Sequence, residues 1–169
     1  MVATLLLGWS VGHGSTTLDS WFARGATAFV GSQPRWLLIF TSEWLVLTVA
    51  LASVAVALLR RQWVLAGAVV LCPIIVTVAT AALKHFFDRH NGAYLEYPSG
   101  HTALLVAVLG MMVLVATARP WAVAAAVVLS ALGIVGLVAC GYHFFTDTVG
   151  AATLATAAVC GTARLTSAR

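Results

Sequence analysis

One histidine of the chain stands four residues before an aspartate. Residues spaced like His143 and Asp147 lie on the same face when they belong to one helix. A carboxylate bound to one ring nitrogen of His143 would leave the other nitrogen free to act as a nucleophile or as a base. Structural pairs of this kind are common, so the spacing alone is a weak signal. An aspartate in an apolar segment nevertheless needs a partner, and His143 is the natural one.

A second histidine follows a signal for the start of a helix. Pro98 favours the first turn of a helix, and Ser99 and Gly100 lead into an apolar stretch. The free backbone N–H groups and the dipole of such a helix start favour a bound anion. His101 would lie in the first turn, beside that anion. A capped membrane helix with an incidental histidine explains these residues about as well.

A short basic segment precedes both histidine motifs. Lys84 and Arg89 are cations close to the end of an apolar stretch. Basic residues in that position commonly anchor a helix at the membrane surface. Membership of a functional site is a second interpretation, because Lys84 and Arg89 fall on the same predicted side of the membrane as the two histidine motifs.

The composition of the chain indicates which kind of protein carries these motifs. Of the 169 residues, 62% are hydrophobic and only 8% are charged, and the mean hydropathy is +1.01. A soluble domain is about half apolar and about a quarter charged, so soluble, disordered and coiled-coil proteins are excluded. The chain is therefore predicted to be an all-α, multi-pass transmembrane helical bundle, surrounded by membrane lipids. The lysines and arginines form no cluster in the sequence, so nucleic acid is not expected as a partner.

Five stretches of the sequence come close to the roughly 20 apolar residues that a transmembrane helix needs. They are residues 36–59, 63–83, 101–118, 121–140 and 144–163. Residues 2–11 are too few to cross a bilayer, and the sequence leaves open whether they are the stub of a sixth span. The predicted organisation is an N-terminal region over residues 1–35, a transmembrane domain over residues 36–163 and a tail over residues 164–169.

Residues 17–30 have a different pattern from the five stretches. A helix over this range places four large apolar side chains near one face, namely Leu18, Trp21, Phe22 and Phe29, with Asp19 and Arg24 elsewhere. The pattern is typical of an interfacial helix that lies on the membrane. A linker before the first span is the alternative.

Charged residues divide between the two ends of the five predicted spans. One end carries no acid and has five arginines, which are Arg60, Arg61, Arg119, Arg164 and Arg169. The other end receives all five acids and all five histidines. The positive-inside rule places the arginine end and the C-terminus in the cytoplasm, so the histidines of this predicted plasma-membrane protein face outward. Ionisable groups at a membrane face are costly and often functional, which predicts a site on the outer side.

Taken together, the three segments resemble the type 2 phosphatidic acid phosphatase superfamily of membrane lipid phosphatases. That family has a lysine-led basic motif, then Pro-Ser-Gly-His, then a Ser-Arg-led motif that ends in His-x-x-x-Asp. The second motif matches fully at residues 98–101, and the end of the third matches at His143 and Asp147. The first and third motifs are degenerate: the Arg-Pro positions hold Asn91 and Gly92, and the Ser-Arg positions hold Gly136 and Leu137.

The resemblance implies a two-step phosphoryl transfer. His143 would form a phosphohistidine, Asp147 would hold its ring, and His101 would protonate the leaving lipid alkoxide. The resemblance further implies a phosphate site made of Lys84, Arg89, Ser99 and Gly100. Other possible site residues are His90, Asn91 and Glu43. Glu43 could pair with Lys84 or touch the head group, but a shallow carboxylate in the membrane interface is the favoured interpretation. The substrate would be a polyprenyl phosphate or diphosphate, a prenyl-linked sugar phosphate or a phosphatidate-type lipid.

The implied mechanism requires no metal and no other cofactor. The sequence also lacks a carboxylate cluster of the kind that holds Mg²⁺. Zinc on His85, His90 and His101 is disfavoured, because two histidines five residues apart share a helical face poorly. The missing arginines keep a second function open, that of a catalytically weakened relative that binds lipid or joins a membrane complex.

Overall fold

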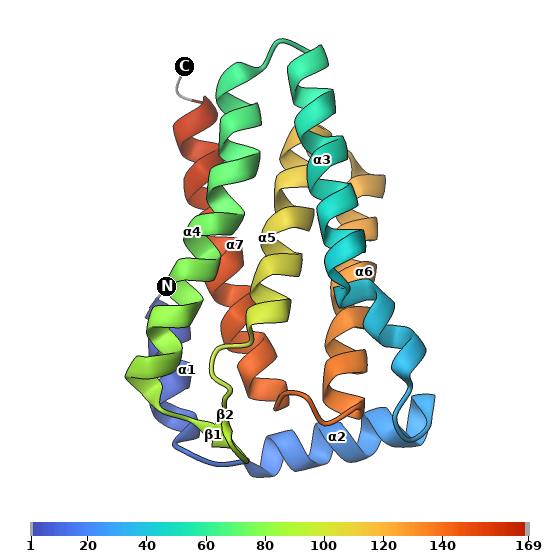
Figure 1. The fold of residues 1–169 in the computed structure, drawn as a ribbon, viewed down its shortest axis with the longest axis vertical. Coiled ribbons are helices and arrows are strands. Elements are labelled where there is room, and N and C mark those ends of the chain that lie inside the picture. Colours follow the sequence, from blue (N-terminus) through green and yellow to red (C-terminus); the bar gives the residue numbers. More distant parts are fainter. Residues whose placement is uncertain (1, 168–169) are drawn as a thin grey trace.

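The computed structural model describes residues 2–167 and shows within them an all-α bundle of seven α-helices (Figure 1). A short 3₁₀-helix and a two-stranded antiparallel hairpin complete the fold. The elements in chain order are α1 (Val2–Val11), α2 (Thr17–Val30), η1 (Arg35–Thr41), α3 (Glu43–Leu59), α4 (Trp63–Phe87), β1 (His90–Asn91), β2 (Tyr94–Leu95), α5 (Gly100–Val115), α6 (Pro120–Ala139) and α7 (Phe145–Ser167). Of the predicted tail, residues up to 167 continue α7, and residues 168–169 lie outside the described part, as does residue 1 of the predicted N-terminal region.

Three segments of the described chain are long and apolar enough to cross a membrane. They are Arg35–Leu59, Trp63–Phe87 and Pro120–Ala139, which indicates a multi-pass membrane protein. The other two predicted spans are less clear. Helix α5 has 16 residues and is about 24 Å long, less than the roughly 30 Å of a bilayer core. Helix α7 has 23 residues, but Asp147 and several threonines lower its hydropathy.

The first predicted span is not one continuous α-helix. Residues Arg35–Thr41 form the 3₁₀-helix η1, and α3 begins only at Glu43. Between them Ser42 has an extended backbone, and its hydroxyl accepts a hydrogen bond from the N–H of Leu45. A serine in this position caps a helix and therefore sets where α3 starts.

Helix α5 lies at the centre of the bundle and packs against α3, α4, α6 and α7 (Figure 1). Its contact with α7 uses small side chains, because Ala103 and Ala107 are buried in the same cluster as Ala151 and Ala155. A methyl group added to Gly110 would lie only 2.8 Å from Val159. Small residues let the helices approach closely, as membrane bundles require.

Helix α2 has the bounds predicted for the interfacial helix and crosses the end of the bundle (Figure 1). Its N-terminus is fixed by a capping box between Thr16 and Asp19. The apolar side chains Leu18, Trp21 and Phe29 are exposed on its outer side, whereas Phe22 stacks on Phe145 with ring centroids 3.9 Å apart. Asp19 is buried against the bundle. The contact of α2 with a membrane surface stays a prediction.

Helix α1, the segment that the sequence left open as the stub of a sixth span, packs against α7. The hydroxyl groups of Thr4 and Thr153 lie 3.0 Å apart, and the Tyr97 hydroxyl donates to the carbonyl of Thr4. Gly8 leaves room for the rings of Phe87 and Tyr97, since a methyl group there would lie 2.6 Å from both. The N-terminal helix is therefore an integral part of the end that carries the histidines.

Candidate active site

A cavity of about 600 Å³ opens at the hairpin end of the bundle. It lies among η1, α3, α4, the hairpin, α5 and the loop before α7. Among the residues that line it are six that bear on chemistry: Glu43, Lys84, Glu96, Gly100, His101 and His143. The fold therefore brings together parts of all three sequence motifs, although they come from different elements.

The two histidines of the cavity lie close together in its lining. Their ring centroids are 6.0 Å apart. His101 is the second residue of α5 and is exposed, whereas His143 is buried in the loop before α7. Two imidazole rings this close together can both contact one small bound group.

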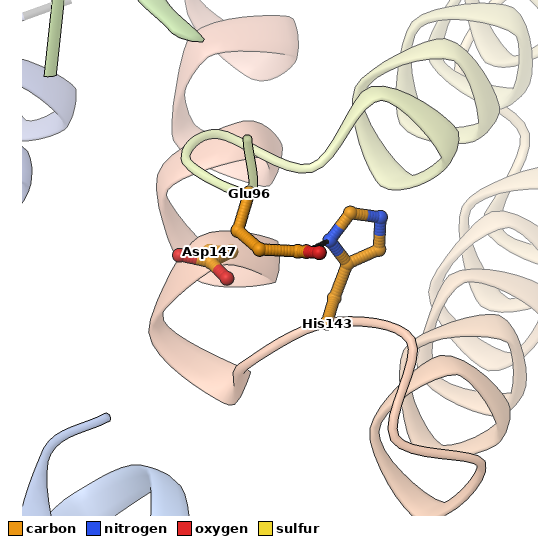
Figure 2. A group of neighbouring side chains, drawn as sticks. All are labelled: Glu96, His143 and Asp147. Atoms are coloured by element: carbon orange, nitrogen blue, oxygen red, sulfur yellow. Dashed lines mark ion pairs between the residues drawn. The ribbon is translucent and has the colours of Figure 1, made fainter. Parts of the chain in front are cut away.

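The acidic partner of His143 differs from the sequence prediction. Helix α7 begins at Phe145, so His143 precedes the helix, and the four-residue spacing does not place it on one helical face with Asp147. Nδ1 of His143 instead forms a direct ion-pair contact with Oε2 of Glu96, and both side chains are buried. Figure 2 shows the Glu96 carboxylate pointing at the imidazole ring, with Asp147 on the first turn of α7. The two carboxylates thus have different partners.

Glu96 is a functional candidate that the sequence reasoning missed. It follows β2 directly, and its N–H donates to the carbonyl of Arg89 at 2.8 Å, which closes the hairpin and directs the segment toward the bundle. The available signal was the rarity of acids, since the chain has only five, and one of them stands two residues before Pro98. A buried carboxylate needs a charged or hydrogen-bonding partner.

Arg89 does not line the cavity, contrary to its predicted role as a phosphate ligand. Its side chain is completely buried. Nη1 donates to Oγ1 of Thr146 at 2.7 Å and to Oδ1 of Asp147 at 2.6 Å. Nη2 donates to the Gly14 carbonyl and to Oδ2 of Asp19, both at 2.8 Å, and Nε donates to the same carbonyl at 3.2 Å. The five N–H groups of the guanidinium are thus used, and none is left for a phosphate oxygen.

Asp19 is the second acid whose role the sequence reasoning missed. Its Oδ1 accepts a hydrogen bond from the N–H of Thr146 at 2.8 Å, and Oδ2 accepts from the N–H and hydroxyl of Thr16. Burial by itself would raise the pKa of Asp19, but the hydrogen bonds from Thr146 and Thr16 outweigh it, so the pKa lies below its ordinary value. Asp19 is therefore a charged anchor between α2 and the start of α7.

The other predicted phosphate ligands divide between the cavity and the protein interior. Lys84 lines the cavity, half-buried, and Nζ donates to the Leu95 carbonyl at 2.6 Å. Gly100 lines it as the first residue of α5. Ser99 is completely buried, and its hydroxyl caps α5 by accepting from the N–H of Thr102. Ser99 therefore positions the helix start and does not face the cavity.

The three remaining candidates also have different settings. Glu43 lines the cavity at the start of α3. His90 is exposed beside Asp88, with Nδ1 3.1 Å from the Asp88 carbonyl, and it does not line the cavity. Asn91 donates from Nδ2 to the Gly141 carbonyl at 3.4 Å and thereby links the hairpin to the loop before His143. Of the three, only Glu43 can meet a bound ligand directly.

Glu96, His143 and Asp147 each offer an atom that could bind a metal ion, and these atoms lie within 4.8 Å of one another. The surroundings fit a cation poorly. Both oxygens of Asp147 already accept hydrogen bonds, one from Arg89 and one from the N–H of Phe144 at 3.1 Å. A divalent ion would also lie close to the guanidinium, which repels it. The arrangement is suited to ion pairs within the protein.

Comparisons of the chain with protein-family models, with curated proteins and with solved structures give no match. The functional argument consequently rests on the geometry of the cavity and on the motif resemblance at residues 98–101, His143 and Asp147.

Proposed function

We propose that the chain is a membrane phosphatase that hydrolyses a lipid phosphate through a phosphohistidine intermediate. The observation that carries the proposal is that two histidines lie close together in the lining of one cavity. His101 and His143 have ring centroids 6.0 Å apart, and Nδ1 of His143 is engaged by Glu96. The free Nε2 of His143 is then the nucleophile, and Glu96 stabilises the imidazolium that forms.

The chemistry divides into two displacements. In the first, Nε2 of His143 attacks phosphorus, a P–N bond forms, the P–O bond to the lipid breaks, and protonated His101 gives its proton to the leaving oxygen. In the second, neutral His101 takes a proton from water, and the water oxygen attacks phosphorus. The P–N bond then breaks and inorganic phosphate leaves. One histidine thus acts as nucleophile and the other first as acid and then as base.

The phosphate oxygens have donors at the start of α5 and on α4. Ser99 engages the N–H groups of Thr102 and Ala103, through its hydroxyl and its carbonyl. The N–H groups of Gly100 and His101 are the remaining donors of this first turn, at the positive end of the helix dipole. Lys84, in the last turn of α4, supplies a positive charge from the lining of the same cavity.

The shape of the cavity supports a lipid as the substrate. Its lining continues from the histidines to Val46 on α3, Thr77 on α4 and Leu104 on α5, which lie deeper in the bundle. An apolar chain could follow these side chains while the phosphate stays at the polar end. We include a five-span arrangement in the plasma membrane in the proposal, with the cavity on the extracytoplasmic side and the arginine end in the cytoplasm.

One observation favours the second function, a lipid-binding or complex-forming subunit. Among the residues described as lining the cavity, Lys84 is the single lysine or arginine, and Glu43 and Glu96 share the lining. A phosphatase site usually binds phosphate with arginines, whose paired N–H groups match its oxygens. A cavity with one lysine binds phosphate more weakly, which suits a lipid-binding protein better than a fast enzyme.

The deciding experiment is phosphate release by purified protein from a panel of lipid phosphates in detergent. His143→Ala is compared with His90→Ala, which changes the same residue type outside the cavity. Release by wild type and His90→Ala together with none by His143→Ala supports the phosphatase. If wild type and both variants retain lipid and none of them releases phosphate, the result supports the binding subunit. Release that survives in His143→Ala would exclude the phosphohistidine mechanism.

A further inference from the structure

The end of the bundle opposite the candidate site is basic. Among the described residues, four arginines lie there, at or near the ends of helices: Arg60, Arg61, Arg119 and Arg164. The five acids belong to α2, the start of α3, the hairpin segment and the start of α7, all at the other end (Figure 1). A negatively charged ligand is therefore attracted to the arginine end, where none of the described side chains is a carboxylate.

A cavity of about 400 Å³ lies at this basic end, between α3, α5 and α6. Arg60 and Arg119 line it from two different interhelical turns. Its interior is lined by apolar side chains that include Val49, Val56 and Met112. The cavity thus combines two positive charges with an apolar lining, which is complementary to an amphiphile with an acidic head group.

The two arginines are not equally engaged by the protein. Nη1 of Arg60 donates to the carbonyl of Val115 at 2.7 Å, which anchors its guanidinium at the end of α5. Arg119 precedes Pro120 at the start of α6, where its side chain makes no capping bond. The start of α6 adds the positive end of a helix dipole. One cation is therefore positioned by the protein, and the other is available to a ligand.

Trp121 completes the cavity lining and remains 65% exposed. A tryptophan at the end of a membrane helix favours the level of the lipid head groups. Its presence next to Arg119 places the polar part of this cavity at that level and the apolar part within the hydrocarbon region.

We propose that this cavity binds one anionic phospholipid of the surrounding membrane. The lipid phosphate lies between Arg60 and Arg119, and one acyl chain lies along Val49, Val56 and Met112. Arginine forms charge-assisted, paired hydrogen bonds with phosphate, and basic pockets between membrane helices bind anionic head groups. A zwitterionic lipid binds less well, because its own ammonium group is repelled by the two arginines. The site is separate from the candidate active site and does not depend on the proposed phosphatase activity.

The test is a titration of the full-length protein in detergent with phosphatidylglycerol or phosphatidylcholine of the same acyl chains, followed by native mass spectrometry. The expected result is one tightly retained phosphatidylglycerol per chain and clearly weaker retention of phosphatidylcholine. The double variant Arg60→Gln/Arg119→Gln should lose this preference, with binding about tenfold weaker or more, as the loss of a charge-assisted hydrogen bond implies. Soluble glycerol phosphate should not compete, because the acyl chain contributes to binding.

Arg61→Gln is the matched control, since it removes the same charge from the same end of the bundle without altering the lining of this cavity. An equal loss of binding in Arg61→Gln would indicate general attraction to a basic surface and would overturn the proposal. A second variant, Ala52→Trp, fills the cavity and keeps both arginines. It should also lose the retained lipid, and it remains informative if removal of Arg60 disturbs folding. Unchanged retention in Ala52→Trp would likewise overturn the proposal.

Discussion

Nη1 of Arg89 lies 2.6 Å from Oδ1 of Asp147, and both side chains are completely buried. The same guanidinium lies 2.8 Å from Oδ2 of Asp19. One cation therefore joins α2, the segment before the hairpin and the first turn of α7. Because that turn follows His143 after a single residue, the ion triad fixes the loop that carries the proposed nucleophile.

Replacing Arg89 with methionine should destabilise the protein severely. The substitution leaves the carboxylates of Asp19 and Asp147 buried without their cation, and breaking a buried ion pair in this way costs about 3–5 kcal/mol. Thermal unfolding in detergent measures the effect. Arg24→Met is the control, because Arg24 is exposed on α2. Equal midpoints for the two variants would contradict the structural role of Arg89.

The charge of Asp19 should make stability depend on pH. Its pKa in the folded state lies below the ordinary value because of the hydrogen bonds from Thr146 and Thr16, which outweigh the effect of burial. A depressed pKa gives stability that is fully present above the unfolded-state pKa of about 3.9 and is lost as the pH falls through the folded-state pKa. The stability advantage of wild type over Asp19→Asn should thus be constant from about pH 5 to pH 7 and shrink below about pH 4. Unfolding midpoints measured across this range test it, with exposed Asp88→Asn as the control. A constant advantage down to pH 3 would contradict it.

The helices followed from the sequence because long apolar stretches and Ser or Pro caps are local signals. The break at Ser42 was missed, since residues on both sides of it are apolar and hydropathy carries no information about backbone direction. Helix α5 ends at Val115, three residues before the predicted end of its span. Turn residues after an apolar helix resemble the helix in hydropathy. The sequence therefore predicts the end of α5 less accurately than it predicts that the helix exists.

The candidate site was only partly predictable, for a physical reason that its charged residues illustrate. The predicted spans place the motifs of His101, His143 and Lys84 on one side of the membrane, and the structure has these three residues in the lining of one cavity. The pairing of charges depends instead on how the hairpin and α2 return to the bundle end. Arg89 pairs with Asp19, which lies 70 positions away in the sequence. Glu96, and not the expected Asp147, contacts Nδ1 of His143. No local pattern encodes such partners.

The contact between α1 and the site region should be sensitive to one methyl group. Gly8→Ala places a carbon atom 2.6 Å from the rings of Phe87 and Tyr97, so the packing must shift. Overpacking of this kind destabilises by about 1–3 kcal/mol. Gly25→Ala on α2 is the matched control, because nothing lies within 4 Å of its added methyl group and helix propensity should stabilise it slightly. Thermal unfolding should rank Gly8→Ala below wild type and Gly25→Ala at or above it; the reverse order would contradict this packing of α1.

The partner of His143 gives the sharpest test of the proposed chemistry. In Glu96→Gln the side chain keeps its size but loses the charge that stabilises the imidazolium, so the rate of phosphate release should fall by about 10²-fold or more with little change in KM. Glu43→Gln removes the same charge from the same cavity without contacting His143, and its effect on kcat should be much smaller. Asp147→Asn should differ from both, because its carboxylate binds Arg89: loss of thermal stability should accompany loss of activity. Steady-state kinetics together with unfolding midpoints separate the three variants. If Asp147→Asn instead has normal stability and shows the kinetic defect expected for Glu96→Gln, then Asp147 and not Glu96 orients His143.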